Sequence, residues 1–191
     1  MRKKDDLKQE AIIKAVITQT NEIGFVNISM SKIAKAAGIS PSTLYIYYAN
    51  KETMFEEIYK DCKREMLEVV NSGLLVDIPV KTSVMQFCQN VVNFLENYLD
   101  TALFLEQATN SPVLRPHLDE KEQLQLSKPA YAVFNKGIKE GILKDTDPNL
   151  LIGFCMYPIV AFYKEVLQNE QLEEIIDYNY LFSMCWDAIK A

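Results

Sequence analysis

Cysteine and histidine are the side chains of this sequence that could carry nucleophilic, redox or metal chemistry. Four cysteines lie far apart in apolar sequence, with no CxxC pair: Cys62, Cys88, Cys155 and Cys185. This spacing predicts buried free thiols. A thiol-based redox sensor is the alternative, because Cys62 has the cationic neighbours Lys63 and Arg64. His117 is the only histidine, which excludes a multi-histidine metal site, and we expect neither a metal nor a cofactor.

The motifs that mark common enzyme classes are absent from the sequence. It contains no GxGxxG, no GKS or GKT phosphate loop, no HExxH and no GxSxG. A catalytic triad would have to use His117, and no serine or cysteine is marked out as its partner. We therefore expect that the protein is not an enzyme, and keep catalysis as an alternative.

Charge is distributed unevenly along the chain, which has an overall net charge of -6. Residues 1–51 contain eight Lys or Arg against four Asp or Glu, a net charge of +4. Residues 52–191 contain twelve against twenty-two, a net charge of -10. Because nucleic acids attract basic surfaces, this asymmetry favours a nucleic-acid-binding head on an acidic body.

Apolar residues recur with the 3.6-residue period of an amphipathic helix, and no stretch shows the sustained alternation of a strand. The 191 residues suffice for a sizeable core. The predicted fold is all-α, with about nine helices. These span about residues 5–23, 30–36, 41–47, 51–71, 80–99, 101–109, 119–140, 147–167 and 171–189. Pro158 is expected to kink its helix and to mark a pocket wall.

Two short helices in the head are marked by capping residues. Ser29 is a suitable N-cap for the first, and Gly38 lies just beyond its end. Ser40 is a suitable N-cap for the second, and Pro41 is a favourable first helical residue. Two such helices separated by so tight a turn predict a helix-turn-helix.

The segment from Ser29 to Glu52 runs SMSKIAKAAGISPSTLYIYYANKE. It resembles the DNA-binding head of the TetR (tetracycline-repressor) family, in which IA, AG, S, TLY, YF and then K and E follow at this spacing. The resemblance covers about residues 7–60, and the remaining sequence agrees in helix number and length. It implies a three-helix DNA-binding domain at residues 1–50 and a ligand-binding and dimerisation domain at residues 51–191.

The resemblance also implies roles for individual residues of the head. Three would face the major groove, where rings and hydroxyls contact thymine methyl groups and base edges: Pro41, Ser42 and Tyr45. Others would contact phosphates: Thr43, Tyr47 and Lys51, helped by Ser29 or Ser31 at the start of the preceding helix. Leu44 and Tyr48 would be buried, Tyr48 in place of the usual Phe, and the buried hydroxyl would need a partner.

Direct reading of the bases is expected to be limited. Residues 40–48 contain no Arg, Lys, Asn or Gln, the side chains that make bidentate base contacts. Sequence preference would then depend on DNA shape, on apolar contacts, or on Arg2, Lys3 and Lys4 reaching a groove or the backbone. A solvated N-terminal tail is the alternative for these three residues.

The acidic body is rich in apolar and aromatic residues. The resemblance implies that its last two helices, about residues 147–189, form a four-helix homodimer interface with a second copy. It also implies a ligand cavity, for which the sequence offers ten residues: Phe87, Phe94, Tyr98, Phe104, Glu106, His117, Tyr131, Phe134, Phe154 and Tyr157. Ordinary core is the alternative for the apolar residues, and a surface loop is the alternative for His117.

The sequence as a whole predicts a ligand-responsive transcriptional regulator, a repressor released from a palindromic DNA operator when a small molecule binds the body. A helical small-molecule or protein-binding module without DNA binding is the alternative from another class. The first residues are polar, and we expect no apolar run to reach the ~20 residues of a membrane-spanning helix. We therefore expect a cytoplasmic protein without a membrane partner.

Overall fold

The chain folds almost entirely into α-helices. The computed structural model describes residues 2–110, 120–169 and 177–191, and these ranges contain nine α-helices, one 3-10 turn and no β-strand. The helices are α1 (Arg2–Ile23), α2 (Met30–Ala36), α3 (Pro41–Tyr47), α4 (Lys51–Val70), α5 (Val80–Asn97), α6 (Leu99–Asn110), α7 (Glu120–Lys139), α8 (Pro148–Gln168) and α9 (Tyr178–Ile189), with the turn η1 (Phe25–Asn27) after α1. The predicted all-α class is confirmed. Helix bounds agree with the prediction within about three residues, apart from the expected start at residue 171, which lies outside the described residues.

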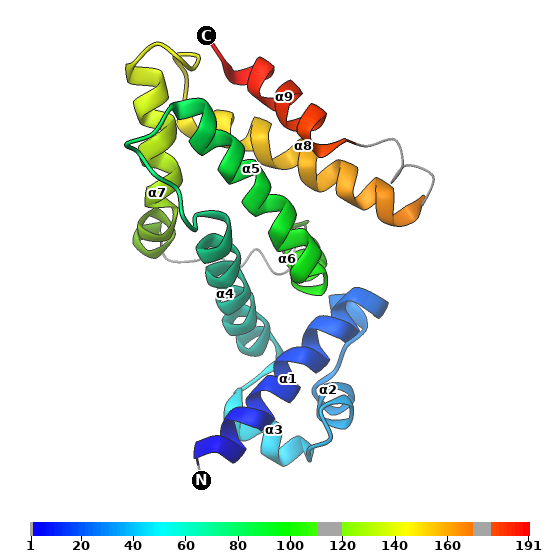
Figure 1. The fold of residues 1–191 in the computed structure, drawn as a ribbon. Helices are drawn as coiled ribbons and strands as arrows, with labels where there is room; N and C mark the ends of the chain where they lie inside the picture. Colours follow the sequence, from blue (N-terminus) through cyan, green and yellow to red (C-terminus); the bar gives the residue numbers. More distant parts are fainter. Residues whose placement is uncertain (1, 111–119, 170–176) are drawn as a thin grey trace. The chain divides into compact units, whose positions relative to one another are not determined.

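Residue contacts divide the chain into two compact units (Figure 1). The first comprises residues 1–65 and 98–120, and it contains α1, α2, α3, most of α4, and α6. The second comprises residues 66–97 and 121–191, and it contains the end of α4 with α5, α7, α8 and α9. The first unit is therefore built from two separate stretches of sequence, because α6 packs on α1.

Capping side chains define the two short helices of the first unit. Ser29 Oγ accepts a hydrogen bond from the Lys32 amide at 3.3 Å, and Ser40 Oγ accepts one from the Thr43 amide at 3.1 Å. Gly38 has a φ of 68°, a left-handed conformation that glycine adopts without steric cost. α2 and α3 therefore form the helix-turn-helix that these capping residues predict.

Apolar side chains from α1 to α4 form the core of the first unit. Its fully buried members include Ile12, Val16, Ile33, Leu44, Met54 and Ile58. Phe55 of α4 contacts Phe25 of η1, with ring centroids 4.4 Å apart, and Phe104 of α6, with centroids 6.0 Å apart. Asn21 of α1 donates a hydrogen bond to the backbone oxygen of Asp100 at 2.8 Å. These contacts hold α1, α4 and α6 together as a frame for the head.

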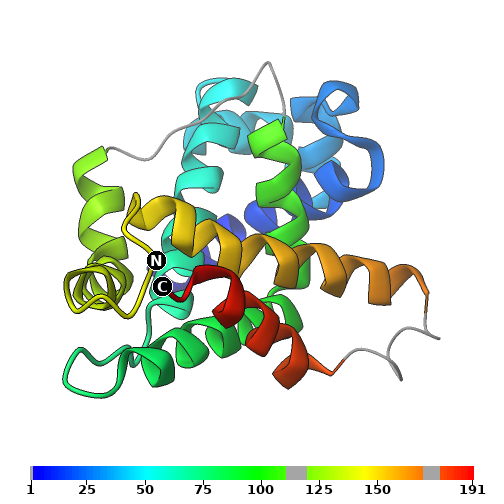
Figure 2. The same ribbon diagram turned by 90° about the horizontal axis from the view of Figure 1, so that it is seen from above.

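In the second unit α5, α8 and α9 pack side by side (Figure 2). Cys88, Cys155 and Cys185 contribute one buried thiol from each of these helices, and Cys62 is buried in the first unit. The prediction of buried free thiols is confirmed. Burial is the main cause that raises the pKa of Cys62 to about 12, so this thiol lacks the lowered pKa that a redox sensor needs.

Two buried asparagines secure the end of α4 in the second unit. Pro129 lies inside α7, and the amide of the next residue, Ala130, donates to Asn71 Oδ1 at 3.1 Å. Asn90 of α5 donates to the backbone oxygen of Ser72 at 2.8 Å. Because buried polar groups are costly without partners, these bonds specify how the end of α4 meets α5 and α7.

Gly137 marks a close approach inside the second unit. An added Cβ would lie 2.6 Å from the side chain of Leu143 and 2.9 Å from that of Val80, and both of these residues are buried. We expect Gly137→Ala to lower the free energy of unfolding by about 1–3 kcal/mol through overpacking, despite alanine's better helix propensity. Urea unfolding measures this loss. In the double variant with Leu143→Ala the cost of Gly137→Ala should shrink, and an unchanged cost would contradict the proposed clash.

α8 is apolar along most of its length. Among the described residues it is the one helix long and apolar enough to cross a membrane, with a mean hydropathy of 1.6 over the qualifying window. The expectation that no apolar run reaches this length is therefore wrong for α8. Only 17% of that window is buried within the structure. Pro158 lies inside α8 without ending it, and an apolar face of the helix remains open.

Candidate nucleic-acid interface

The short helix α3 presents three faces. Residues four apart lie on nearly the same side of a helix with 3.6 residues per turn. Leu44 points inward and is fully buried, whereas Thr43 and Tyr47 are partly exposed on one flank. The remaining residues of the helix form one exposed face: Pro41, Ser42, Tyr45 and Ile46.

This exposed face carries two large side chains. Tyr45 is 54% exposed and Ile46 is 81% exposed. A ring and a branched alkyl group on a two-turn helix are suited to contact thymine methyl groups in the major groove. Ile46 was not among the site residues expected from the sequence. Its four-residue spacing from Ser42 on a helix with a marked N-cap is the signal that locates it.

Three hydroxyl groups cluster at the start of α3. Ser40 Oγ lies 2.8 Å from Ser42 Oγ and 2.8 Å from Thr43 Oγ1. Ser40 already accepts the amide hydrogen of Thr43, so the cluster is anchored to the helix N-terminus. The structure thus brings Ser42 and Thr43 together, and their hydroxyls can donate to phosphate oxygens.

The two tyrosines that follow one another at the end of α3 differ in environment. Partial burial and the nearby Asp5 carboxylate, which accepts a hydrogen bond from the hydroxyl, raise the pKa of Tyr47. A phosphate at Tyr47 would compete with Asp5 for this proton. Tyr48 is buried, as expected, and burial is the main cause that raises its pKa to about 12. Gln9 supplies the hydrogen-bond partner that the buried hydroxyl requires.

Polar groups also gather at the start of α2. Ser29 and Ser31 are exposed, and the Ser29 hydroxyl caps the helix. Lys32 Nζ donates to the backbone oxygen of Asn27 at 2.9 Å, which places an ammonium group beside this helix end. The N-terminus of α2 therefore presents hydroxyls and a positive charge, which suit contact with a phosphate.

Lys51, at the start of α4, makes contacts within the head that the sequence did not indicate. Its Nζ donates to the backbone oxygen of Phe25 at 2.7 Å and lies 4.1 Å from the centroid of the Phe25 ring. Partial burial lowers the pKa of Lys51. The ammonium group therefore joins α4 to the turn η1, and its remaining donors are available to a phosphate.

Removing these contacts should be visible without DNA. We expect Lys51→Met to lower the free energy of unfolding by about 1 kcal/mol, because the Phe25 oxygen loses a charged donor and the ring loses a cation. Urea unfolding followed by circular dichroism measures the change. Lys35→Met, at an exposed position of α2, is the matched control and should leave stability unchanged. Equal losses for the two variants would contradict this role.

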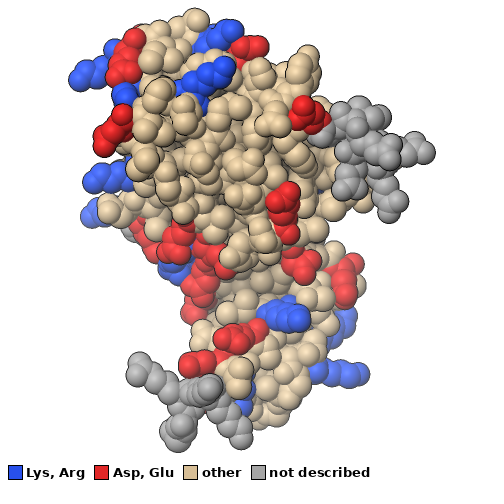
Figure 3. Space-filling model, viewed as in Figure 1, with Lys and Arg blue, Asp and Glu red and all other residues tan. Residues whose placement is uncertain are grey.

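The N-terminal basic residues continue the first helix. The backbone of Arg2, Lys3 and Lys4 belongs to α1, but their side chains lie outside the described residues. Their contact with DNA stays a prediction. On the face shown in Figure 3, basic and acidic side chains are interspersed on the part of the surface that α1 to α4 form. The positive charge of the head is therefore not concentrated on this face.

The residues expected to line one ligand cavity are divided between the two units. Tyr98, Phe104 and Glu106 belong to the first unit. Six others belong to the second unit: Phe87, Phe94, Tyr131, Phe134, Phe154 and Tyr157. His117 lies outside the described residues. Their place in a ligand site stays a prediction.

Several of these aromatic residues pack against other side chains as core. Phe87 and Phe134 are buried and meet edge to face, with ring centroids 5.8 Å apart. Phe94 is buried in the second unit, and Phe104 is buried against Phe55 in the first. A ligand at Phe87 and Phe134 would have to displace one of the two rings.

An apolar groove with a volume of about 400 Å³ runs along the open face of α8. It is lined by Asn149, Leu150, Gly153, Phe154, Tyr157, Pro158 and Ala161. Phe154 is 51% exposed and Tyr157 is 69% exposed. In Figure 3 a broad uncharged surface covers the part of the molecule where α8 and α9 lie. Such a surface suits a protein partner better than water.

Comparisons with known proteins agree with this organisation. A family model described as bacterial regulatory proteins, tetR family, matches residues 12–58, and one described as tetracyclin repressor-like, C-terminal domain, matches residues 79–190. The solved structure of a TetR family transcription regulator from Marinobacter aquaeolei VT8 is similar over 100% of this chain and 99% of its own, with 25% identity and a TM-score of 0.80.

Two relatives from Bacillus subtilis are more distant. The HTH-type transcriptional regulator YhgD is 23% identical over 144 residues, which cover 75% of each protein. The transcriptional regulator FadR, solved in complex with stearoyl-CoA, is 20% identical over 93% of this chain and 95% of its own, with a TM-score of 0.68. The likeness to FadR shows that the two proteins share a fold.

A helix-turn-helix head followed by a larger helical part defines a DNA-binding transcriptional regulator. The chain belongs to the TetR family of bacterial regulatory proteins, since the C-terminal match alone spans more than half of its length. The resemblance seen in the residues from Ser29 to Glu52 is confirmed.

Proposed function

We propose that this protein is a cytoplasmic repressor that binds a DNA operator through α2 and α3 and releases it when a small molecule binds. The observation that carries the proposal is the exposed face of α3, formed by Pro41, Ser42, Tyr45 and Ile46. This face lies on a capped helix beside a second capped helix, the arrangement by which a helix-turn-helix enters the major groove.

Roles within the head follow from the faces of α3. Pro41, Ser42, Tyr45 and Ile46 contact base edges and thymine methyl groups. Five residues contact phosphates: Ser29, Ser31, Thr43, Tyr47 and Lys51. In this assignment residues 1–50 act as the DNA-binding domain, and residues 51–191 bind the ligand and dimerise.

A second copy of the chain is the proposed occupant of the open face of α8. The groove there is apolar, and neighbouring α9 exposes Tyr180 and Met184 as well. A homodimer through about residues 147–189 would bury these side chains and present two heads to a palindromic operator. Dimerisation also accounts for the hydropathy of α8 without a membrane.

A small-molecule effector is supported by the relatives. FadR from Bacillus subtilis was solved with stearoyl-CoA, which shows a ligand in a protein of this fold. For this chain we propose that aromatic residues of the second unit, among them Phe87, Phe94, Tyr131 and Phe134, contribute to the effector site. Since Phe87 and Phe134 are packed together, binding there requires the rings to separate.

Selection of DNA from a randomised pool of duplexes tests the proposal. We expect the full-length protein to enrich one inverted repeat and to bind it more tightly than a scrambled duplex of the same length. Fluorescence anisotropy measures both affinities. Failure to enrich any sequence, together with equal affinity for the two duplexes, would contradict a sequence-specific repressor.

A further inference from the structure

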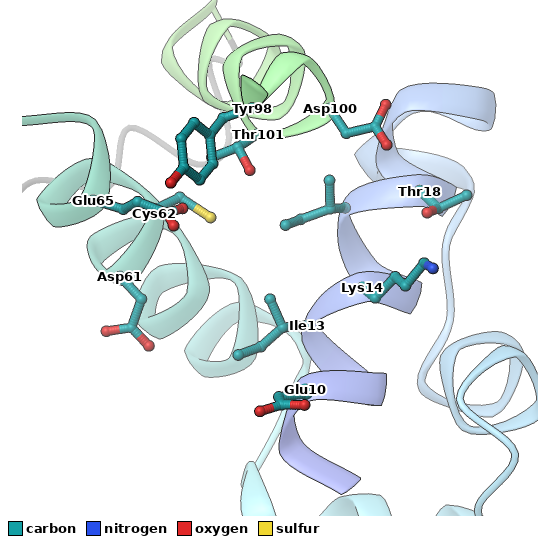
Figure 4. A pocket seen from close by; sticks show the side chains of 11 residues that line it. Glu10, Ile13, Lys14, Thr18, Asp61, Cys62, Glu65, Tyr98, Asp100 and Thr101 are labelled. Carbon is teal, nitrogen blue, oxygen red and sulfur yellow. The ribbon is translucent and has the colours of Figure 1, made fainter. Parts of the chain in front are cut away.

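A cavity of about 540 Å³ lies within the first unit, between α1, α4 and α6 (Figure 4). Small-molecule sites in proteins have volumes of roughly 300–1,000 Å³. All of its lining residues belong to the first unit, so the cavity does not depend on the second. Of the residues expected from the sequence to bind a ligand, Tyr98 alone lines it.

Apolar and aromatic groups form much of the cavity wall. Ile13 and Ile17 come from α1, and Ile17 is buried. In Figure 4 Ile13 projects from α1 toward α4, and the ring of Tyr98, the residue just before α6, projects toward Cys62 of α4. These side chains can cover hydrocarbon or aromatic parts of a ligand.

Carboxylates line the cavity from all three helices. Glu10 comes from α1, Asp61 and Glu65 from α4, and Asp100 from α6. Lys14 is the one basic side chain in the lining. Asp61 also pairs with Arg64 on its own helix. Four carboxylates and one ammonium group thus line the cavity, so acidic side chains predominate in its wall.

The charge of these carboxylates affects the pKa of a buried side chain in the cavity wall. Cys62 is buried there, and its pKa is raised to about 12 by burial first and then by the charges of Glu65 and Asp61. The field of the carboxylates thus reaches the interior side of the cavity. A cation would be favoured at this position, and an anion would be repelled.

We propose that this cavity binds an organic cation with apolar groups. The hydrocarbon part would contact Ile13, Ile17 and Tyr98, and the positive charge would lie among the carboxylates. A bare metal ion fits less well, because the described residues contain no group of three or more ligating side chains close enough to hold one. An acyl-CoA, the ligand of FadR, carries phosphates that the carboxylates would repel.

A ligand bound in this cavity would directly affect the helices that support the helix-turn-helix. α1 packs on α2, and α4 begins only four residues after α3 ends. A ligand between α1 and α4 therefore favours one arrangement of the head. The next expectation rests on the proposed function. A saturating cation should weaken DNA binding by about 5- to 150-fold, and DNA should weaken cation binding by the same factor.

Tetraphenylphosphonium and tetraphenylborate form a matched pair of probes, because they share size and shape and differ in the sign of their charge. Isothermal titration calorimetry of the full-length protein should detect the phosphonium ion and show binding of the borate ion at least about tenfold weaker. Affinity for the phosphonium ion should fall as salt is raised, since the cavity is open to solvent on one side.

Two double variants test the place of binding. Glu10→Gln with Glu65→Gln removes one carboxylate from each of two facing walls, and both positions are exposed enough to tolerate the change. It should weaken phosphonium binding at least about tenfold. Glu22→Gln with Glu68→Gln removes the same charges from α1 and α4 outside the cavity, and should change the affinity less than about twofold.

Equal binding of the two ions, or equal effects of the two double variants, would overturn the assignment, because the apolar groove on α8 would accept either ion. An unchanged DNA affinity at saturating phosphonium would overturn the coupling to the head. Fluorescence anisotropy with the selected duplex measures DNA binding independently of phosphonium binding, so the cation site and the proposed function can fail separately. DNA binding without phosphonium binding would refute the cation site alone, and phosphonium binding without DNA binding would refute the repressor alone.

Discussion

Replacing Phe154 and Tyr157 together with Asp is expected to convert the protein from a dimer to a monomer. Both rings lie on the open face of α8 and line its groove. In a two-fold interface each substitution occurs twice, so four carboxylates would be desolvated against apolar surface. Size-exclusion chromatography with light scattering should give about twice 21.9 kDa for the wild type and 21.9 kDa for the variant.

The same double variant should bind the operator more than about 100-fold more weakly, because two linked heads engage adjacent half-sites at a high effective concentration. Leu124→Asp provides the control, since Leu124 is an exposed apolar residue on α7, outside the proposed interface. This variant should remain a dimer. A monomeric wild type at micromolar concentration, or a double variant that stays dimeric, would contradict the proposed interface.

Replacing Ile46 with Glu is expected to lower DNA affinity more than about 100-fold on any sequence. The new carboxylate would enter a groove lined by phosphates, and like charges in contact cost several kcal/mol. Because Ile46 is 81% exposed, the substitution should leave folding stability unchanged. Fluorescence anisotropy and urea unfolding of the same sample measure both effects.

Ile23→Glu is the matched control for Ile46→Glu. Ile23 is also an exposed isoleucine of the first unit, but it is the last residue of α1 and does not belong to the exposed face of α3. The control should retain DNA affinity within about threefold, since a single exposed charge is largely screened. If the two variants bound DNA equally well, the exposed face of α3 would not be the surface that meets the groove.

The head was predictable because its signals are local. Ser29, Gly38, Ser40 and Pro41 act on neighbouring backbone groups, so their positions define α2 and α3 without knowledge of the rest of the chain. The contact of Lys51 with Phe25 was not predictable in this way. It joins residues 26 positions apart, and its geometry depends on how α4 leaves the helix-turn-helix.

The candidate ligand site was less predictable, because core and pocket use the same side chains. Phe87 and Phe134 were expected to line a cavity, yet they pack edge to face. The cavity at α1, α4 and α6 has carboxylates at Glu10 and Asp100 that belong to helices far apart in sequence. Their convergence depends on the packing of α6 on α1, which no local pattern indicates.

The salt dependence of DNA binding tests the central claim most directly. Anisotropy titrations of the selected duplex and a scrambled duplex at several salt concentrations report phosphate contacts through the slope and base contacts through the ratio of affinities. We expect log affinity to fall linearly with log salt, by about 0.9 per neutralised phosphate, and Lys51→Ala to reduce that slope by about one. The ratio should lie near the low end of the usual ~10³ to 10⁷ range, because α3 lacks bidentate base readers. An affinity that hardly changes with salt and is the same for both duplexes would contradict the account of this protein as a DNA-binding regulator.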